Sequence, residues 1–422
     1  MSFLFATRAR RSVLLAALVL SGGTAWSQPL TLAEALRLAG ANAPSVSASD
    51  AAARGARELA VSAGQLPDPV LRAGIDNLPV DGPDAWSLDR DFMTMRRIGV
   101  MQEYVSTAKR AARMERGERE ARRFDAEAQM SMAEVRSEVA SAWYDRLFAL
   151  KAEDIQLRLQ DEIAMQRRAT GAQISSGKAS AADVLTIDAL LIQAQDRVIA
   201  ARRQQQVAAA RLARWIGGDA DRPPAGEPGL PTENDVLALR EHDLHNIPHL
   251  RVLATQLDVA AAEVEVAEQN RTPNWSWEVS YAQRGPAYSN MISVGVSVPL
   301  PIGRADRQDR EVAARLAQRD QVRDQIEDAR RRHASEFTAL RLEWQGLSER
   351  QRQLETALLP ITRQRVEAVL ASYGSGQQNL AAVLEARRAE VDARIQVLDL
   401  ERESARIWAR LRYTYLEQEG AK

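Results

Sequence analysis

Three of the chain's four histidines, His242, His245 and His249, have a spacing that could bind a metal ion. Positions i, i+3 and i+7 share one face of a helix, and imidazole is a common ligand of transition metals. Pro248 would break such a helix just before the third histidine, because proline lacks an amide hydrogen and clashes with the preceding turn. We therefore predict no metal site from this spacing, and whether the three histidines bind metal stays open.

Motifs for catalysis are absent from the sequence. The segment 171–178 has two glycines and a lysine, but it does not match the spacing of a phosphate loop, and no HExxH, GxSxG or GxGxxG motif occurs. The chain has no cysteine, which excludes disulfides, iron–sulfur clusters and a thiol nucleophile. We expect that the protein is not an enzyme and needs no cofactor.

The composition points to long helices. Lys and Arg total 56 and Asp and Glu total 57, so no basic excess favours a nucleic-acid partner. Only 5% of the 422 residues are aromatic, whereas Ala, Leu, Glu, Gln and Arg are abundant. This mixture is typical of long helices and coiled coils.

The first 27 residues have the pattern of a secretory signal peptide. Arg8, Arg10 and Arg11 precede an apolar run over 13–20, and small residues follow up to a cleavage site before Gln28. No later stretch approaches 18 uninterrupted apolar residues, so the exported chain has no predicted transmembrane helix. Only a β-barrel could then span a membrane.

The mature chain follows one plan twice. A Thr-x-x-acid start, a proline, a second proline before paired strands, a strand glycine and a helix-breaking glycine all recur 196–206 residues later. A nearly constant offset indicates a duplication. The predicted organisation is a signal peptide (1–27), a first repeat (28–216), a Pro- and Gly-rich linker without regular structure (217–231), a second repeat (232–418) and a tail (419–422).

Each repeat should contain two strands. Trp275, Trp277 and Tyr281 alternate with polar residues, which predicts one apolar face, and residues 69–79 and 93–105 have a less regular pattern of the same kind. An ordinary edge hairpin is one interpretation. Exposed tryptophans on a secreted strand agree better with a face turned to lipid.

The strands alternate with unusually long helices. Residues 107–176 contain no proline, and neither do residues 303–359, where the helical pattern continues to 372. Apolar residues at 3,4 spacing predict knobs-into-holes packing along both stretches. One such row comprises Phe337, Leu340, Trp344, Leu347, Leu354, Leu358 and Ile361.

Four strands cannot enclose a pore, because small closed barrels need about eight. Three copies would supply twelve. The predicted fold class is mainly α with a small β part, in which duplicated helical hairpins form a long α-barrel and four strands per chain contribute to a twelve-stranded transmembrane β-barrel of a homotrimer.

With these features, the chain resembles the TolC-type outer-membrane efflux protein family. The resemblance spans nearly all of residues 28–418 and rests on LTLAEAL at 30–36, VPLPIG at 298–303 and the motifs at 177–185 and 373–384. Residues 66–79 and 91–103 are similar to the heavy-metal cation efflux branch. The resemblance implies an outer-membrane duct with a large periplasmic part, fed by an inner-membrane efflux pump through a periplasmic adaptor protein.

The resemblance also implies roles at the two helix reversals. Gly177 and Lys178 at one tip, with Gly374 and Gly376 at the other, would form the docking surface for the adaptor. The aperture gate would comprise Asp183, Tyr373, Gln378 and Glu385, with a hydrogen bond from Tyr373 to Asp183. Gln378 replaces the family's basic residue and Ala382 one of its acidic residues, so this gate would lack one ion pair and part of an acidic ring.

The predicted function is passive exit of cargo through the outer membrane, with transition-metal cations as the expected cargo. A duct for small organic compounds or antibiotics is an alternative, and an exported coiled-coil scaffold without a pore is another. Neither the cargo, nor the particular pump and adaptor, nor whether the resting duct is open or closed follows from the sequence.

Overall fold

The computed structural model describes residues 29–174, 180–226, 229–237 and 247–416. The predicted signal peptide and tail lie outside these residues. The first half of the chain comprises α1 (Leu32–Ala41), α2 (Pro44–Ala63), β1 (Val70–Asp76), β2 (Met95–Tyr104), α3 (Thr107–Ile174) and α4 (Ala181–Ile216). The second half comprises α5 (Glu233–Leu237), α6 (Pro248–Gln269), β3 (Trp275–Gln283), β4 (Met291–Ser297), α7 (Gln308–Gln353), α8 (Leu359–Gly374) and α9 (Leu380–Arg410).

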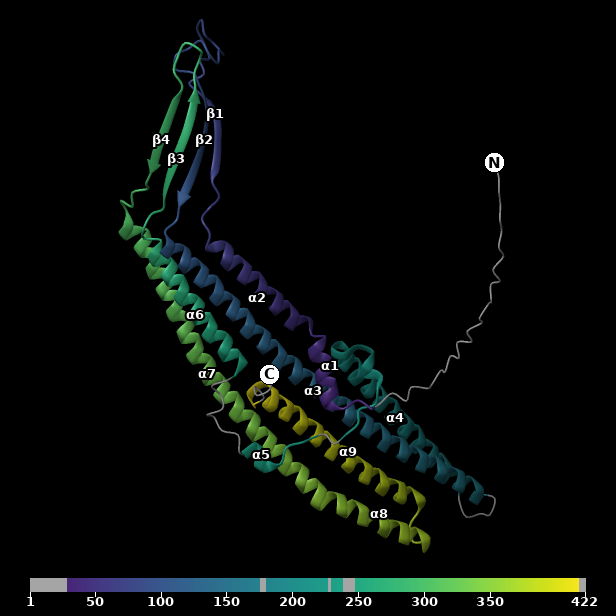
Figure 1. Ribbon diagram of the computed structural model, residues 1–422. Coiled ribbons are helices and arrows are strands. Elements are labelled where there is room, and N and C mark those ends of the chain that lie inside the picture. Colours follow the sequence, from purple (N-terminus) through teal and green to yellow (C-terminus); the bar gives the residue numbers. More distant parts are fainter. Residues whose placement is uncertain (1–28, 175–179, 227–228, 238–246, 417–422) are drawn as a thin grey trace, which may run out of the picture.

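The two halves thus have the same order of elements, with the strands at one end of an elongated molecule and the helix reversals at the other (Figure 1). The repeat boundaries that the sequence predicts remain a prediction. Helix α3 has 68 residues, which corresponds to a rod of about 100 Å at 1.5 Å per residue. Within the described residues, none of the helices combines the length and the apolar character needed to cross a membrane.

A π-helical turn, Leu354–Leu358, separates α7 from α8, just before Pro360. Proline cannot donate to the fourth carbonyl behind it, and a π turn accommodates this missing bond. The wider turn also shifts the apolar row by one residue. Ile361, which the 3,4 spacing places in the row, is exposed, whereas Thr362 and Val366 are buried. The prediction was therefore wrong beyond the π turn.

The four strands form one antiparallel sheet in the order β1-β2-β3-β4. The pairing of β2 with β3 joins the two halves, with Gly99 opposite Ser280. A Cβ atom at Gly99 would lie 2.6 Å from the Ser280 Cβ, so a larger residue would push the two strands apart. A buried lysine braces the strand–helix junction: Lys109 Nζ donates to the carbonyl of Thr272 at 2.7 Å and to Asn274 Oδ1 at 2.8 Å.

The two predicted Thr-x-x-acid helix starts, at Thr31 and Thr232, are both present. Only the second forms a full capping box. Thr232 and Asp235 exchange side chain to backbone bonds in both directions. Thr31 Oγ1 accepts from the amide of Glu34, whose carboxylate instead pairs with Arg222 at 2.9 Å. That ion pair fixes the connecting segment against α1.

The connecting segment is more regular than its prolines and glycines predict. Residues Gly217–Asp221 form a 3-10 helix, and Pro224 makes a parallel β-bridge with Leu30. The amide of Leu30 donates to the carbonyl of Pro223 at 2.9 Å. These bonds satisfy backbone groups that would otherwise be buried without partners.

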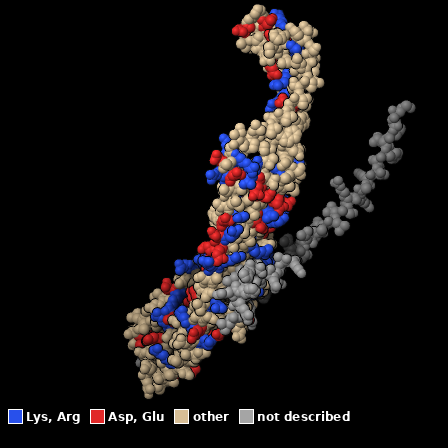
Figure 2. Space-filling model, turned by 90° about the vertical axis from the view of Figure 1, so that its left-hand side faces the viewer, with Lys and Arg blue, Asp and Glu red and all other residues tan. Residues whose placement is uncertain are grey.

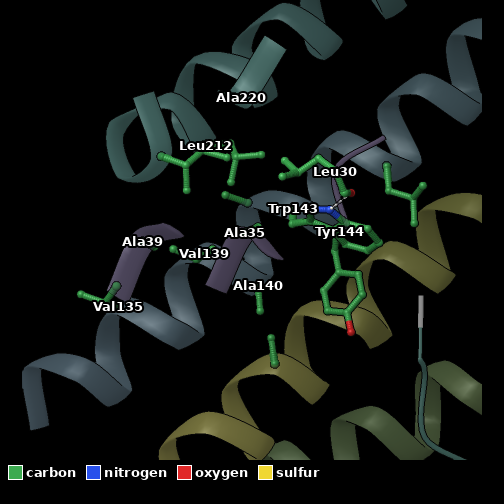
Figure 3. Packing of buried hydrophobic residues seen from close by; sticks show 14 of the residues in the cluster. Leu30, Ala35, Ala39, Val135, Val139, Ala140, Trp143, Tyr144, Leu212 and Ala220 are labelled. Carbon is green, nitrogen blue, oxygen red and sulfur yellow. Dashed lines mark hydrogen bonds between the residues drawn. The ribbon is translucent and has the colours of Figure 1, made fainter. Parts of the chain in front are cut away.

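The main core lies where Leu30 and α1 meet α3, α4 and α9. Trp143 is fully buried there, and its indole Nε1 donates to the carbonyl of Leu30 at 2.9 Å (Figure 3). Its ring meets that of Tyr144 edge-on, and burial raises the pKa of Tyr144 to about 12. Small residues of α1, Ala35 and Ala39, let that helix approach α3 closely (Figure 3).

Candidate functional site: the helix reversals and the exposed sheet

The second helix reversal lies between α8 and α9. Gly374 ends α8, and Gly376 has a φ of 78°, a conformation that glycine adopts without strain. The amides of Gln377 and Gln378 both donate to the carbonyl of Ser372, which closes the end of the helix. Gln378 is exposed. Gly177 and Lys178, at the first reversal, lie outside the described residues.

Each returning helix begins with a polar cap. Ser180 and Asp183 form a full capping box at α4, and Asn379 Oδ1 accepts from the amide of Ala382 at α9. The Ser180 amide and hydroxyl both donate to the Asp183 carboxylate, at 2.9 and 2.7 Å. These two bonds hold the pKa of Asp183 below its usual range, with the backbone donor as the larger cause.

The expected hydrogen bond from Tyr373 to Asp183 is not formed among the described residues. Asp183 is used locally as a cap, because Ser180 offers two donors three residues away. The half-buried Tyr373 instead packs against a cluster at the base of α9 that contains Leu380, Val383 and Leu384. Glu385 is exposed on the first turns of α9. The roles of these residues in an aperture remain a prediction.

Two ion pairs that the sequence does not reveal join α9 to the first hairpin. Arg197 Nη1 of α4 lies 2.6 Å from Asp392 Oδ1, and Arg387 Nε lies 3.1 Å from Glu162 Oε1 of α3. Residues of each pair stand about 200 positions apart in the chain, so no local spacing could indicate them. They fix α9 against the α3–α4 hairpin just above the reversals.

A buried carboxylate reinforces the same region. Glu390 is 3% exposed and lies within 3.6 Å of three arginines: Arg363 of α8, and Arg387 and Arg394 of α9. Burying a carboxylate is costly unless it is paired. Because Arg387 also contacts Glu162, the network runs from α8 through α9 to α3.

The sheet has one apolar and one polar face. Val279 and Tyr281 of β3 lie opposite Val294 and Ile292 of β4, so their side chains share a face. All four are at least 41% exposed, and Trp275 and Trp277 are 38% exposed. Figure 2 shows broad uncharged surface on the strand-bearing arm, with charged side chains gathered at its tip and over the helices.

The opposite face carries small and charged residues. Arg72 of β1 reaches Glu278 of β3 across Gly99, with an Nη1–Oε2 distance of 3.0 Å. Ser280, Ser293 and Gly295 lie on this face too. The alternation predicted from the sequence is therefore present. Most of the exposed large apolar side chains lie on one face of the sheet, and Val70 and Met291 are exposed on the other.

His242 and His245 lie outside the described residues. His249 stands in the first turn of α6, and its imidazole contacts that of His333 on α7. Among the described residues, no group of three or more histidine, aspartate or glutamate side chains is arranged to hold a metal ion.

This chain is similar in sequence to known outer-membrane efflux proteins. A family model described as outer membrane efflux protein matches residues 239–414. The cobalt-zinc-cadmium resistance protein CzcC of Cupriavidus metallidurans is 25% identical over 379 residues, which cover 88% of this chain and 86% of that protein.

Solved structures share the fold over almost the whole chain. The CmeC outer membrane channel of Campylobacter jejuni has a TM-score of 0.74 and 13% identity, covering 98% of this chain and 94% of that one. The outer membrane protein VceC of Vibrio cholerae has a TM-score of 0.72 and 16% identity, covering 91% and 96%. In sequence over residues 239–414 and in fold over almost its whole length, the chain is therefore similar to the TolC-type outer-membrane efflux proteins, and it is a protein of the outer membrane.

Proposed function

We propose that three copies of this chain form the outer-membrane exit duct of a tripartite efflux system. The observation that carries the proposal is the open, one-sided sheet. Strands β1 and β4 lie at its two edges, and among the described residues neither has a partner on its outer side. Unpaired edges of this kind are normally covered or paired.

The edges are suited to pair with each other in a ring. Both β1 and β4 have seven residues, and four strands in antiparallel order leave β4 antiparallel to β1 of the next copy. Three copies would close twelve strands, with the apolar face that includes Trp275, Trp277 and Tyr281 outward in lipid and the polar face inward. An exported scaffold without a pore gives no reason for this exposed apolar face.

The helices support the same assembly. Leu185, Ile192 and Ile199 on α4 are each at least 66% exposed and lie seven residues apart. A heptad row of apolar residues is what a neighbouring helix would cover in a coiled coil. We assign this row to the contact between copies, so that the helices complete an α-barrel below the sheet.

The reversals then lie at the end of the duct farthest from the membrane. We propose that Gly177, Lys178, Gly374 and Gly376 form the surface on which a periplasmic adaptor protein docks. Asp183, Tyr373, Gln378 and Glu385 would surround the aperture, where threefold symmetry brings equal charges close together. An inner-membrane pump would deliver the cargo through the adaptor.

Transition-metal cations are the proposed cargo. The support is the similarity to a cobalt-zinc-cadmium resistance protein over most of both chains. Deletion of the gene tests the proposal: tolerance to Co²⁺, Zn²⁺ and Cd²⁺ should fall, and the intact gene should restore it. Unchanged metal tolerance with heightened sensitivity to dyes or antibiotics would instead establish the alternative, a duct for small organic compounds.

A further inference from the structure

Two histidines that are 84 positions apart meet between α6 and α7. His249 Nδ1 lies 3.0 Å from His333 Nε2, and the ring centroids are 5.3 Å apart at an interplanar angle of 72°. The two helices run side by side below the strands (Figure 1). Bringing two imidazole nitrogens together in a chain with four histidines needs an explanation beyond helix packing.

The second nitrogen of His333 faces a carboxylate. Its Nδ1 lies 3.5 Å from Glu336 Oε2 and is buried without a hydrogen-bond partner among the described residues. The hydroxyl of Tyr415 donates to the same Glu336 oxygen at 3.3 Å. A metal-bound histidine commonly directs its other ring nitrogen to a carboxylate, which orients the ring and raises its basicity.

The two rings differ in their access to solvent. The His333 side chain is 13% exposed, whereas His249 is half-buried and borders an open groove of about 970 Å³. A cation at this point would therefore be reached from the side of His249.

We propose that His249 Nδ1 and His333 Nε2 together bind one transition-metal cation of the Zn²⁺, Cu²⁺, Ni²⁺ and Co²⁺ class, with water completing its coordination. With metal–nitrogen distances of 2.0–2.1 Å, two ligand nitrogens lie about 2.9 Å apart at a right angle and about 3.3 Å apart in a tetrahedron. The observed 3.0 Å falls between these values. Carboxylate-only sites bind hard cations, but imidazole pairs select these metals.

Binding needs one proton to change place and none to leave. The hydrogen that now lies between the two rings belongs to one of them, and it moves to the other nitrogen of that ring. In the bound state the Nδ1 hydrogen of His333 points to Glu336 and that on His249 Nε2 is free to meet water. The cation would enter through the groove, which Asp320, Asp324 and Asp328 of α7 also line.

A cation bound there would tie the first turn of α6 to the middle of α7. The site is independent of what the duct transports, so it can exist whether or not metals are the cargo. The proposal rests on the two described histidines alone and does not include His242 or His245.

Copper spectroscopy tests the site directly. The mature protein, in detergent, with any affinity tag removed and stripped by a chelator, is titrated with CuCl₂ and its electron paramagnetic resonance spectrum is recorded. We expect one ion per chain with splitting from two nitrogens. His249→Gln and His333→Gln should each weaken binding at least tenfold. Calorimetric titration with Zn²⁺ should rank the affinities of the parent and the variants in the same order.

The double variant His242→Gln/His245→Gln is the matched control and should bind as the parent does. His249→Gln changes a half-buried residue, so its circular dichroism should match the parent and keep the test valid even if His333→Gln misfolds. Absence of stoichiometric binding to the parent would overturn the proposal. So would binding that survives both single substitutions or is lost in the control.

Discussion

Some of the residues that matter most here act through one short contact, and Gly99 is the clearest case. A Cβ at this position would lie 2.6 Å from the Ser280 Cβ and 2.9 Å from the carbonyl oxygen of Val279. Gly295 occupies the corresponding strand of the second half, but nothing lies within 4 Å of its Cβ position. Two glycines that look equivalent in the sequence therefore have different reasons to be there.

Gly99→Ala should destabilise the protein by about 1–3 kcal/mol, because backbone must move to admit the methyl group. Gly295→Ala is the matched control and should change the thermal midpoint little. Melting curves of the detergent-solubilised protein, followed by circular dichroism, provide the comparison. Equal midpoints for the two variants would contradict the close approach of β2 and β3.

Glu401 on α9 makes a pH-dependent contribution. Burial raises its pKa, Glu355 raises it further, and Lys151 opposes both. Because the folded chain holds this proton more tightly than the unfolded chain, the contribution to stability is largest below about pH 4.5 and is lost as pH rises through the raised pKa. Glu401→Gln should therefore raise the thermal midpoint at pH 7 and lose that advantage near pH 4.

The exposed Glu403, two residues along the same helix, is the control for this effect. Glu403→Gln should leave the thermal midpoint nearly unchanged at both pH values. If the difference in thermal midpoint between Glu401→Gln and the parent is the same at both pH values, burial does not raise the pKa of Glu401.

At the scale of single residues, the sequence predicts contacts between residues a few positions apart, but it does not predict contacts between residues far apart in the chain. The cap of Thr232 and Asp235 follows from residue types three positions apart. Among the described residues, the hydrogen bond expected from Tyr373 to Asp183 is not formed, and the carboxylate accepts from Ser180 instead. The contact of His249 with His333 depends on how α6 and α7 pack, and no sequence spacing encodes it.

At the scale of elements, proline-free length and apolar spacing were sufficient to predict the long helices and the strand pairs. The row of apolar residues fails at the π turn Leu354–Leu358, because an extra residue in one turn rotates everything that follows. Because of that rotation, Thr362 and Val366 are buried and Ile361 is exposed. A sequence pattern read at a constant 3.6-residue period cannot anticipate it.

The ion pair of Arg197 with Asp392 is the best candidate for a contact that keeps the duct narrow. It is partly exposed, so each copy contributes on the order of 0–1 kcal/mol, but a trimer would repeat it three times. Asp392→Asn should increase the open fraction of single channels in planar bilayers severalfold. The exchanged pair Arg197→Asp/Asp392→Arg should return it toward the parent.

Asp154→Asn removes the Arg158–Asp154 pair, whose two exposed side chains both belong to α3, so that it joins no separate helices. It serves as the control and should leave the open fraction unchanged. Opening by this variant to the same extent as by Asp392→Asn would show that surface charge, and not the link between hairpins, controls the aperture.

At the scale of the whole molecule, closing the sheet into a barrel requires an assembly of three chains. The open sheet edges and the exposed row of Leu185, Ile192 and Ile199 both need a neighbour. Light scattering of the detergent-solubilised protein should give the mass of three chains. Ile192→Glu should lower that mass, because it places a charge in each contact between copies, and a monomeric parent with full helicity would contradict the closed barrel.

A duct through the outer membrane is tested most directly by the electrical conductance of the protein reconstituted into a planar lipid bilayer. We expect discrete, equal current steps, each from one trimer inserted through its apolar strand face, with larger or longer openings in Asp392→Asn. Protein that inserts and remains folded and trimeric, yet gives no steps in either the parent or this variant, would contradict a duct through the outer membrane.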